Sequence, residues 1–80
     1  MNNFLDYVIV ELGDSGWERD QEGNYLSPGR TARCEISKIY GYCQFYKKNG
    51  NNSWRSVSKY SEGISDYSGI DISIHALSRE

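Results

Sequence analysis

The sequence is poor in the residues that most often bind metals or act as catalysts, with one histidine and two cysteines among 80 residues. These three soft ligands show none of the close Cys–Cys or His–His spacings that mark a structural zinc site. The lone histidine, His75, is more often a surface side chain than a catalytic base, and no pair of carboxylates is placed around a pocket. We therefore predict that the protein is not an enzyme and has no catalytic residues, no metal and no cofactor.

The sequence also lacks a long hydrophobic run. The apolar stretch near the N-terminus, residues 7–10, is closed by Glu11. It is too short for a membrane span or for the core of a signal peptide. We therefore expect a complete cytoplasmic chain with no membrane contact. In that reducing compartment Cys34 and Cys43 are expected to stay thiols, with at least one of them buried.

Aromatic residues, by contrast, are plentiful. They make up 14 % of the chain, including seven tyrosines, while all hydrophobic residues together make up 38 %. Disordered chains are poor in aromatics and rich in charge, so this composition favours a folded protein. We expect a single small domain over residues 1–80, with a small core, because a chain of this length buries only about 60 % of its unfolded surface.

Charge is distributed unevenly along the chain, although the formal net charge is only −2. Residues 1–29 hold six acidic residues and one arginine, and residues 60–80 hold four acidic residues and one arginine. Residues 30–59 hold seven basic residues and one glutamate. Either these segments neutralise one another across a folded sheet, or they form a bipolar surface that orients the protein on a partner.

Several segments have the residue types of β-strands. Residues 5–12 are rich in β-branched and aromatic side chains, and residues 17–26 contain a turn sequence that predicts a hairpin. Near the C-terminus Ile70, Ile72 and Ile74 alternate with polar residues, which is the period of a half-buried strand.

Residues 31–48 fit two structures. Apolar residues recur there at steps of three and four, as on a helix, but the segment is also rich in β-branched and aromatic residues. As a strand, Ala32, Cys34 and Ile36 would share one face, and Gly41 would mark a bulge or a close approach. The sequence Asn49-Gly50 that follows is typical of a hairpin turn before residues 53–57, and this favours strands.

The turn spacing predicts an all-β fold, a small antiparallel barrel or sandwich of five to six short strands. The alternative is an α+β fold with a helix over residues 31–48.

Residues 38–45, with the sequence KIYGYCQF, resemble the RNP1 pattern of RNA-recognition motifs, in which a basic residue precedes alternating glycines and aromatics. The positions that match are Lys38, Tyr40, Gly41, Tyr42 and Phe45. Residues 7–10 lie where the partner RNP2 strand would be. The resemblance implies that Tyr40, Tyr42 and Phe45 would stack single-stranded bases.

The aromatic and basic residues of the middle of the chain form the candidate binding site. They are Tyr40, Tyr42, Tyr46, Lys47, Lys48, Trp54 and Arg55. Exposed tyrosine, tryptophan and arginine are enriched at protein interfaces. We therefore predict a non-enzymatic binding protein that occupies a surface of a protein partner, in the manner of a phage or mobile-element inhibitor of host machinery. The alternative is a β-domain that binds single-stranded nucleic acid.

Overall fold

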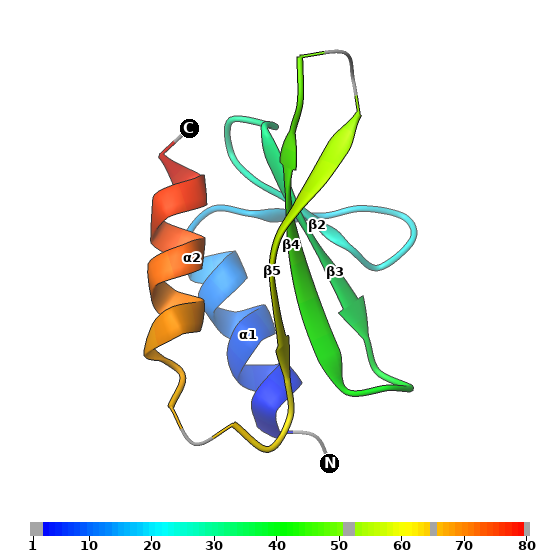
Figure 1. Ribbon diagram of the computed structural model, residues 1–80, viewed down its shortest axis with the longest axis vertical. Helices are drawn as coiled ribbons and strands as arrows, with labels where there is room; N and C mark the ends of the chain where they lie inside the picture. Colours follow the sequence, from blue (N-terminus) through cyan, green and yellow to red (C-terminus); the bar gives the residue numbers. More distant parts are fainter. Residues whose placement is uncertain (1–2, 51–52, 65, 80) are drawn as a thin grey trace.

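The computed structural model describes residues 3–50, 53–64 and 66–79 and contains one antiparallel sheet with two helices on the same side of it (Figure 1). The elements in chain order are α1 (Asn3–Asp14), β1 (Glu18–Arg19), β2 (Tyr25–Leu26), β3 (Ala32–Ser37), β4 (Tyr42–Lys48), β5 (Trp54–Ser61) and α2 (Ser68–Ser78). The strands follow one another in the order β1-β2-β3-β4-β5, and the sheet does not close into a barrel. The fold is therefore α+β, and the predicted all-β barrel or sandwich is wrong, although the sheet has five strands.

Both terminal segments that were predicted to be strands are helices. In α1 the buried side chains are Phe4, Leu5, Val8 and Leu12, which are spaced to form one helical stripe. In α2 Ile70, Ile74 and Leu77 are buried, whereas Ile72 is 68 % exposed. The alternation of isoleucines near the C-terminus thus does not place all three in the core, because Ile72 lies on the side of the helix opposite to Ile70 and Ile74.

Residues 31–48 form strands, so the helix considered for this segment is wrong. β3 pairs with β4 from Ala32↔Lys47 to Ser37↔Tyr42. Gly41 ends the connecting turn with a φ of +68°, and the side chain of Glu62 lies 2.8 Å from the position that a Cβ would occupy. The close approach expected at Gly41 is confirmed, and it explains the absence of a side chain there.

The expected hairpins are also confirmed. Glu18 pairs with Leu26 across the β1–β2 turn, and Lys48 pairs with Trp54 at the end of the β4–β5 hairpin. Residues 51–52 of that second turn lie outside the described residues. Opposite the step from Phe45 to Tyr46 the register of β5 shifts by one residue, which leaves Val57 as the extra residue of a β-bulge.

Helix α1 ends in a Schellman motif. The Trp17 N–H donates to the Leu12 carbonyl at 3.0 Å, and the Gly16 N–H donates to the Gly13 carbonyl at 3.1 Å. Gly16 has a φ of +86°, which favours glycine at this position of the motif. The Trp17 indole N–H then donates to Ser78 Oγ at 2.6 Å, so this short turn also ties the end of α1 to the end of α2.

A second contact between the helices lies near their other ends. The Tyr7 hydroxyl donates to the two carboxylate oxygens of Asp71 at 2.6 and 2.7 Å. This hydrogen bond to an anion raises the pKa of Tyr7 to about 12, with burial and the charge of Asp71 adding to the effect. The ring of Tyr67 packs against Tyr7 at 4.8 Å between ring centroids.

The core lies between the helices and the sheet face that they cover. It holds Trp17 and Phe45, whose rings meet edge to face at 6.2 Å, together with apolar side chains from both helices. Cys34 and Cys43 are both free and fully buried, which agrees with the expectation of a buried thiol. A hydrogen bond with Cys43, together with burial, raises the pKa of Cys34, so this thiol is unreactive at neutral pH.

Candidate binding surface

The sheet face opposite to the helices is uncovered and carries most of the aromatic and charged side chains of β3, β4 and β5 (Figure 1). Neighbouring side chains on a strand point to opposite faces. Since Ala32, Cys34, Cys43 and Phe45 are buried under the helices, the residues between them stand on the open face. We call this surface the open face. The residues whose side chains contact one another on it are Arg33, Glu35, Tyr42, Gln44, Tyr46, Trp54, Ser56 and Lys59.

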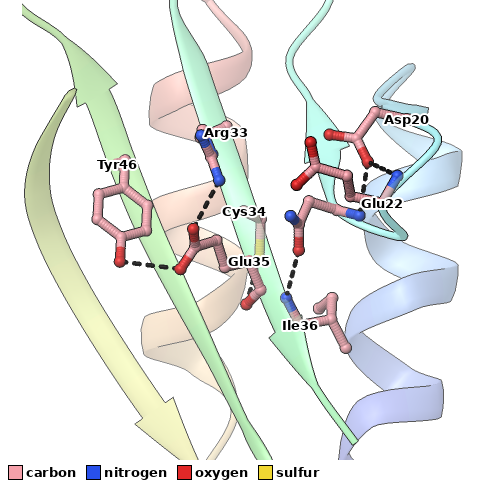
Figure 2. Close-up of polar contacts among 8 residues, drawn as sticks. Asp20, Glu22, Arg33, Cys34, Glu35, Ile36 and Tyr46 are labelled. Carbon is pink, nitrogen blue, oxygen red and sulfur yellow. Dashed lines mark hydrogen bonds and ion pairs between the residues drawn. The ribbon is translucent and has the colours of Figure 1, made fainter. Parts of the chain in front are cut away.

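Four of these side chains, Arg33, Glu35, Tyr46 and Trp54, form one group that we call the Arg33 cluster. The Arg33 Nη2 atom donates to Glu35 Oε2 at 2.6 Å, and the Tyr46 hydroxyl donates to Glu35 Oε1 at 3.0 Å. Figure 2 shows both hydrogen bonds: the one from Arg33 lies within β3, the one from Tyr46 links β4 to β3, and together they use both carboxylate oxygens of Glu35.

The guanidinium of Arg33 also contacts two aromatic rings. Its Cζ atom lies 5.6 Å from the centroid of the Tyr46 ring and 5.6 Å from that of the Trp54 ring. A cation at this distance is attracted to the ring by about 0.5–1 kcal/mol at exposed sites. The cluster thus holds an arginine, a tyrosine and a tryptophan in one defined arrangement on three neighbouring strands.

Burial affects the ionisation of Tyr46 in this cluster. Partial burial, followed by the hydrogen bond to the Glu35 carboxylate, raises the pKa of Tyr46 above its ordinary value. The hydroxyl therefore stays protonated at neutral pH and remains a donor to Glu35, which keeps the cluster in the same arrangement.

Two further contacts tie β5 to β4 on the open face. The Lys59 Nζ atom lies 4.2 Å from the centroid of the Tyr42 ring, and the Gln44 side-chain amide donates to Ser56 Oγ at 2.8 Å. Together with the Arg33 cluster they make the open face a continuous surface of aromatic and cationic groups across β3, β4 and β5.

The structure places the seven candidate residues in three locations rather than one. Tyr42, Tyr46, Lys48 and Trp54 lie on the open face, with Lys48 paired to Trp54 at the hairpin end. Lys47 and Arg55 are paired with each other but stand on the helix side of the same hairpin. Tyr40 lies in the turn between β3 and β4, where it is 79 % exposed.

The three aromatics that resemble RNP1 are also separated. Phe45 is fully buried in the core, Tyr40 is in the turn, and Tyr42 alone lies on the open face. They do not form a common stacking surface.

Five residues of this surface were not among the predicted binding residues: the charged Arg33, Glu35 and Lys59, and the polar Gln44 and Ser56. A signal for the first two was present, because Ala32, Cys34 and Ile36 were expected to share one face of a strand. The residues between them then had to share the other face. Lys59 gave no such signal, because the bulge at Val57 changes which side of β5 each later residue faces.

Among residues 3–50, 53–64 and 66–79, no group of three or more His, Cys, Asp or Glu side chains is arranged to hold a metal ion. His75 is exposed on α2. Over the same residues, no helix is both long enough and apolar enough to cross a membrane.

These observations define a small α+β protein with an open antiparallel sheet, whose uncovered face is aromatic and cationic. A comparison with protein-family models, with curated proteins and with solved structures finds no match to this chain.

Proposed function

We propose that this protein is a non-enzymatic binding module that docks a protein partner on the open face, with the Arg33 cluster at the centre of the contact. The observation that carries the proposal is the position of the Arg33 guanidinium beside the rings of Tyr46 and Trp54, held there by Glu35. Tryptophan, tyrosine and arginine are the residues that most often dominate binding energy at protein interfaces.

The arrangement of the cluster supports binding in a second way. A side chain that is already ordered before association loses less entropy when it binds, which is about 0.5–1.5 kcal/mol for each long side chain. Arg33 is held by one ion pair and two ring contacts, and its side chain is 28 % exposed. The guanidinium of Arg33 and the rings of Tyr46 and Trp54 therefore present a largely preorganised surface.

Glu35 favours a protein over a nucleic acid as the partner. Its carboxylate lies in the middle of the cluster, accepts a hydrogen bond from Arg33, and would repel a phosphate that approaches the same guanidinium. A protein partner can meet this mixture of cation, anion and aromatic ring with complementary groups.

A module that has no catalytic role acts by occupying a surface of its partner, as small inhibitors encoded by phages and mobile elements do. We extend the proposal to that role on the size and composition of the chain alone. We also propose a cytoplasmic location, which the two free thiols of Cys34 and Cys43 support, since buried cysteine pairs often oxidise in secreted proteins.

The test is an affinity purification from host lysate with and without nuclease, followed by binding measurements on the purified partner. Trp54→Ala is expected to weaken binding by about 2 kcal/mol or more, whereas Lys48→Ala at the edge of the open face changes it little. Tyr40→Ala is the matched control, because Tyr40 is exposed but lies in the turn. Melting curves must show that each variant is folded.

Two results would contradict this function. One is an unchanged affinity in a folded Trp54→Ala protein. The other is a complex that nuclease destroys, with an affinity that falls steeply with salt and loses about one unit of salt slope for each lysine removed. That result would instead support the binding of single-stranded nucleic acid to the aromatic rings of the open face.

A further inference from the structure

A second surface lies on the helix side of the molecule, away from the open face. Here α2 and the end of the β4–β5 hairpin border a groove with a volume of about 320 Å³. Its lining includes Lys47 and Arg55 from the hairpin, Val57 from the bulge, and Ile72, Ala76 and Leu77 from α2. In Figure 1 the β4–β5 hairpin extends past the end of α2.

The walls of the groove are apolar and exposed to water. Ile72 is 68 % exposed and Val57 is 47 % exposed. Neither side chain is needed to attach α2 to the sheet, because Ile70 and Ile74 are fully buried and do this. Val57 lies two residues after Arg55 on β5 and therefore faces the same side, where both residues line the groove.

The end of the groove at the hairpin is positively charged. Lys47 and Arg55 are paired across β4 and β5, and they also line an adjoining hollow of about 140 Å³ together with Lys48 and Asn49. Among the residues that the structure describes, no aspartate or glutamate lines either space. The acidic residue of α2 itself, Asp71, is bound to Tyr7 of α1.

An apolar groove that ends at a group of cations complements a ligand with an apolar side chain next to carboxylates. We propose that this groove binds a short acidic segment of a partner protein. One apolar side chain of the segment lies between Val57 and Ile72, and an aspartate or glutamate close to it in sequence meets Arg55 and Lys47.

Charge argues against a second copy of the chain as the occupant. In a symmetric dimer the same surface patch of both copies meets, so each copy would bring Lys47 and Arg55 and none of the described lining residues would supply a carboxylate to pair with them. This contact would bring like charges together and is unfavourable. The size of the groove also fits a few side chains rather than a folded surface.

The site is independent of the Arg33 cluster, and the test uses that independence. A random peptide library is panned against the full-length protein, and an enriched peptide is synthesised and titrated against variants. Enriched peptides are expected to combine aspartate or glutamate with an apolar residue. Arg55→Glu and Ile72→Ser are each expected to weaken binding of the peptide at least about tenfold.

Two control variants separate this proposal from the function proposed above. Trp54→Ala alters the open face and is expected to leave peptide affinity unchanged. Lys59→Glu makes the same charge change as Arg55→Glu but on the open face, and it is also expected to have no effect. Ile72 and Arg55 are exposed, so their variants are expected to keep the melting temperature of the parent protein.

Four results would overturn the proposal. They are the absence of any enriched peptide, enrichment of peptides without acidic residues, affinity that neither Arg55→Glu nor Ile72→Ser reduces, and peptide affinity that falls with Trp54→Ala. Oligothymidylate and phosphatidylglycerol vesicles are tested on the same variants. Binding of either one that depends on both Arg55 and Ile72 would assign the groove to nucleic acid or to an anionic membrane and would also overturn it.

Discussion

The two faces of the sheet are built from the same strands but are held together by different interactions. On β4, Cys43 and Phe45 lie under the helices and are fully buried, while Tyr42 and Tyr46 on the other side are half-buried. The covered face is stabilised by the removal of apolar surface from water. The open face is stabilised by ring–cation contacts and by hydrogen bonds to Glu35, each of which contributes little by itself.

This difference shows where the chain can change without losing its fold. A core side chain is surrounded on all sides, so its removal leaves a cavity. A side chain on the open face touches only its neighbours and water, so its removal exposes little and creates no cavity. The open face is therefore the part of the sheet that can be adapted to a partner.

The largest expected effect is at Phe45. Phe45→Ala is expected to lower the free energy of unfolding by about 3–5 kcal/mol, because the ring is fully buried against Trp17 and Tyr60. Tyr42→Ala, on the open face of the same strand, is expected to cost no more than about 1 kcal/mol. Denaturant titration followed by circular dichroism measures both.

If Phe45→Ala does not fold, Phe45→Leu keeps the comparison measurable. Equal losses of unfolding free energy for Phe45→Leu and Tyr42→Ala would mean that the two faces of the sheet contribute alike to stability. This result would contradict the distinction drawn between them.

The next comparison uses two isoleucines of one helix. Ile74→Ala is expected to cost about 2–5 kcal/mol, because Ile74 is fully buried. Ile72→Ala is expected to change stability by no more than about 0.5 kcal/mol, because Ile72 points away from the core. The melting temperatures of the two variants show which substitution destabilises the protein more. A larger loss of stability for Ile72→Ala would show that α2 is rotated about its axis relative to this structure.

The smallest expected effect is at the contact between the helices. Tyr7→Phe removes the hydrogen bonds to Asp71 and is expected to cost about 1 kcal/mol at neutral pH. The pKa of Tyr7 is raised in the folded protein to about 12 from an ordinary value of 10.0. The contact therefore contributes fully below pH 10 and is lost as the pH rises through about 12.

Unfolding of the parent protein and of Tyr7→Phe is measured across this alkaline range. The stability difference between them is expected to shrink as the pH rises. Asp71→Asn is the matched control, because it keeps a hydrogen-bond acceptor but removes the charge that raises the pKa. A difference that stays constant with pH would contradict the role given to Asp71.

The strands at the middle of the chain could be predicted because their turns are specified locally. Asn49-Gly50 is a residue pair common in hairpin turns, and Gly41 has a positive φ that most other residues avoid. The sequence between such turns is too short for a long helix. The pairing of β4 with β5 near Trp54 could be predicted for the same reason.

The candidate binding residues of the β4–β5 hairpin are divided between two faces because side chains alternate along a strand, which puts Trp54 on the open face and Arg55 on the helix side. The side of β5 that Lys59 faces could not be predicted, because it depends on the β-bulge at Val57. A bulge is one extra residue in a strand, and the residue types around Val57 do not distinguish it from a regular strand.

The sequence by itself determined the hairpin turns near residues 20–23 and 49–50 and the strands beside them, because turn formation depends on the backbone preferences of a few adjacent residues. Tertiary structure decided that both terminal segments are helices. The isoleucines of α2 fit either period, since Ile70 and Ile74 are spaced for a helix and Ile70 and Ile72 for a strand. The sheet exposes one apolar face of Cys34, Cys43 and Phe45, and the helical stripes of α1 and α2 bury it. The free energy of that burial arises only when the helices and the sheet pack together, so it cannot be predicted from the residue pattern of any one segment.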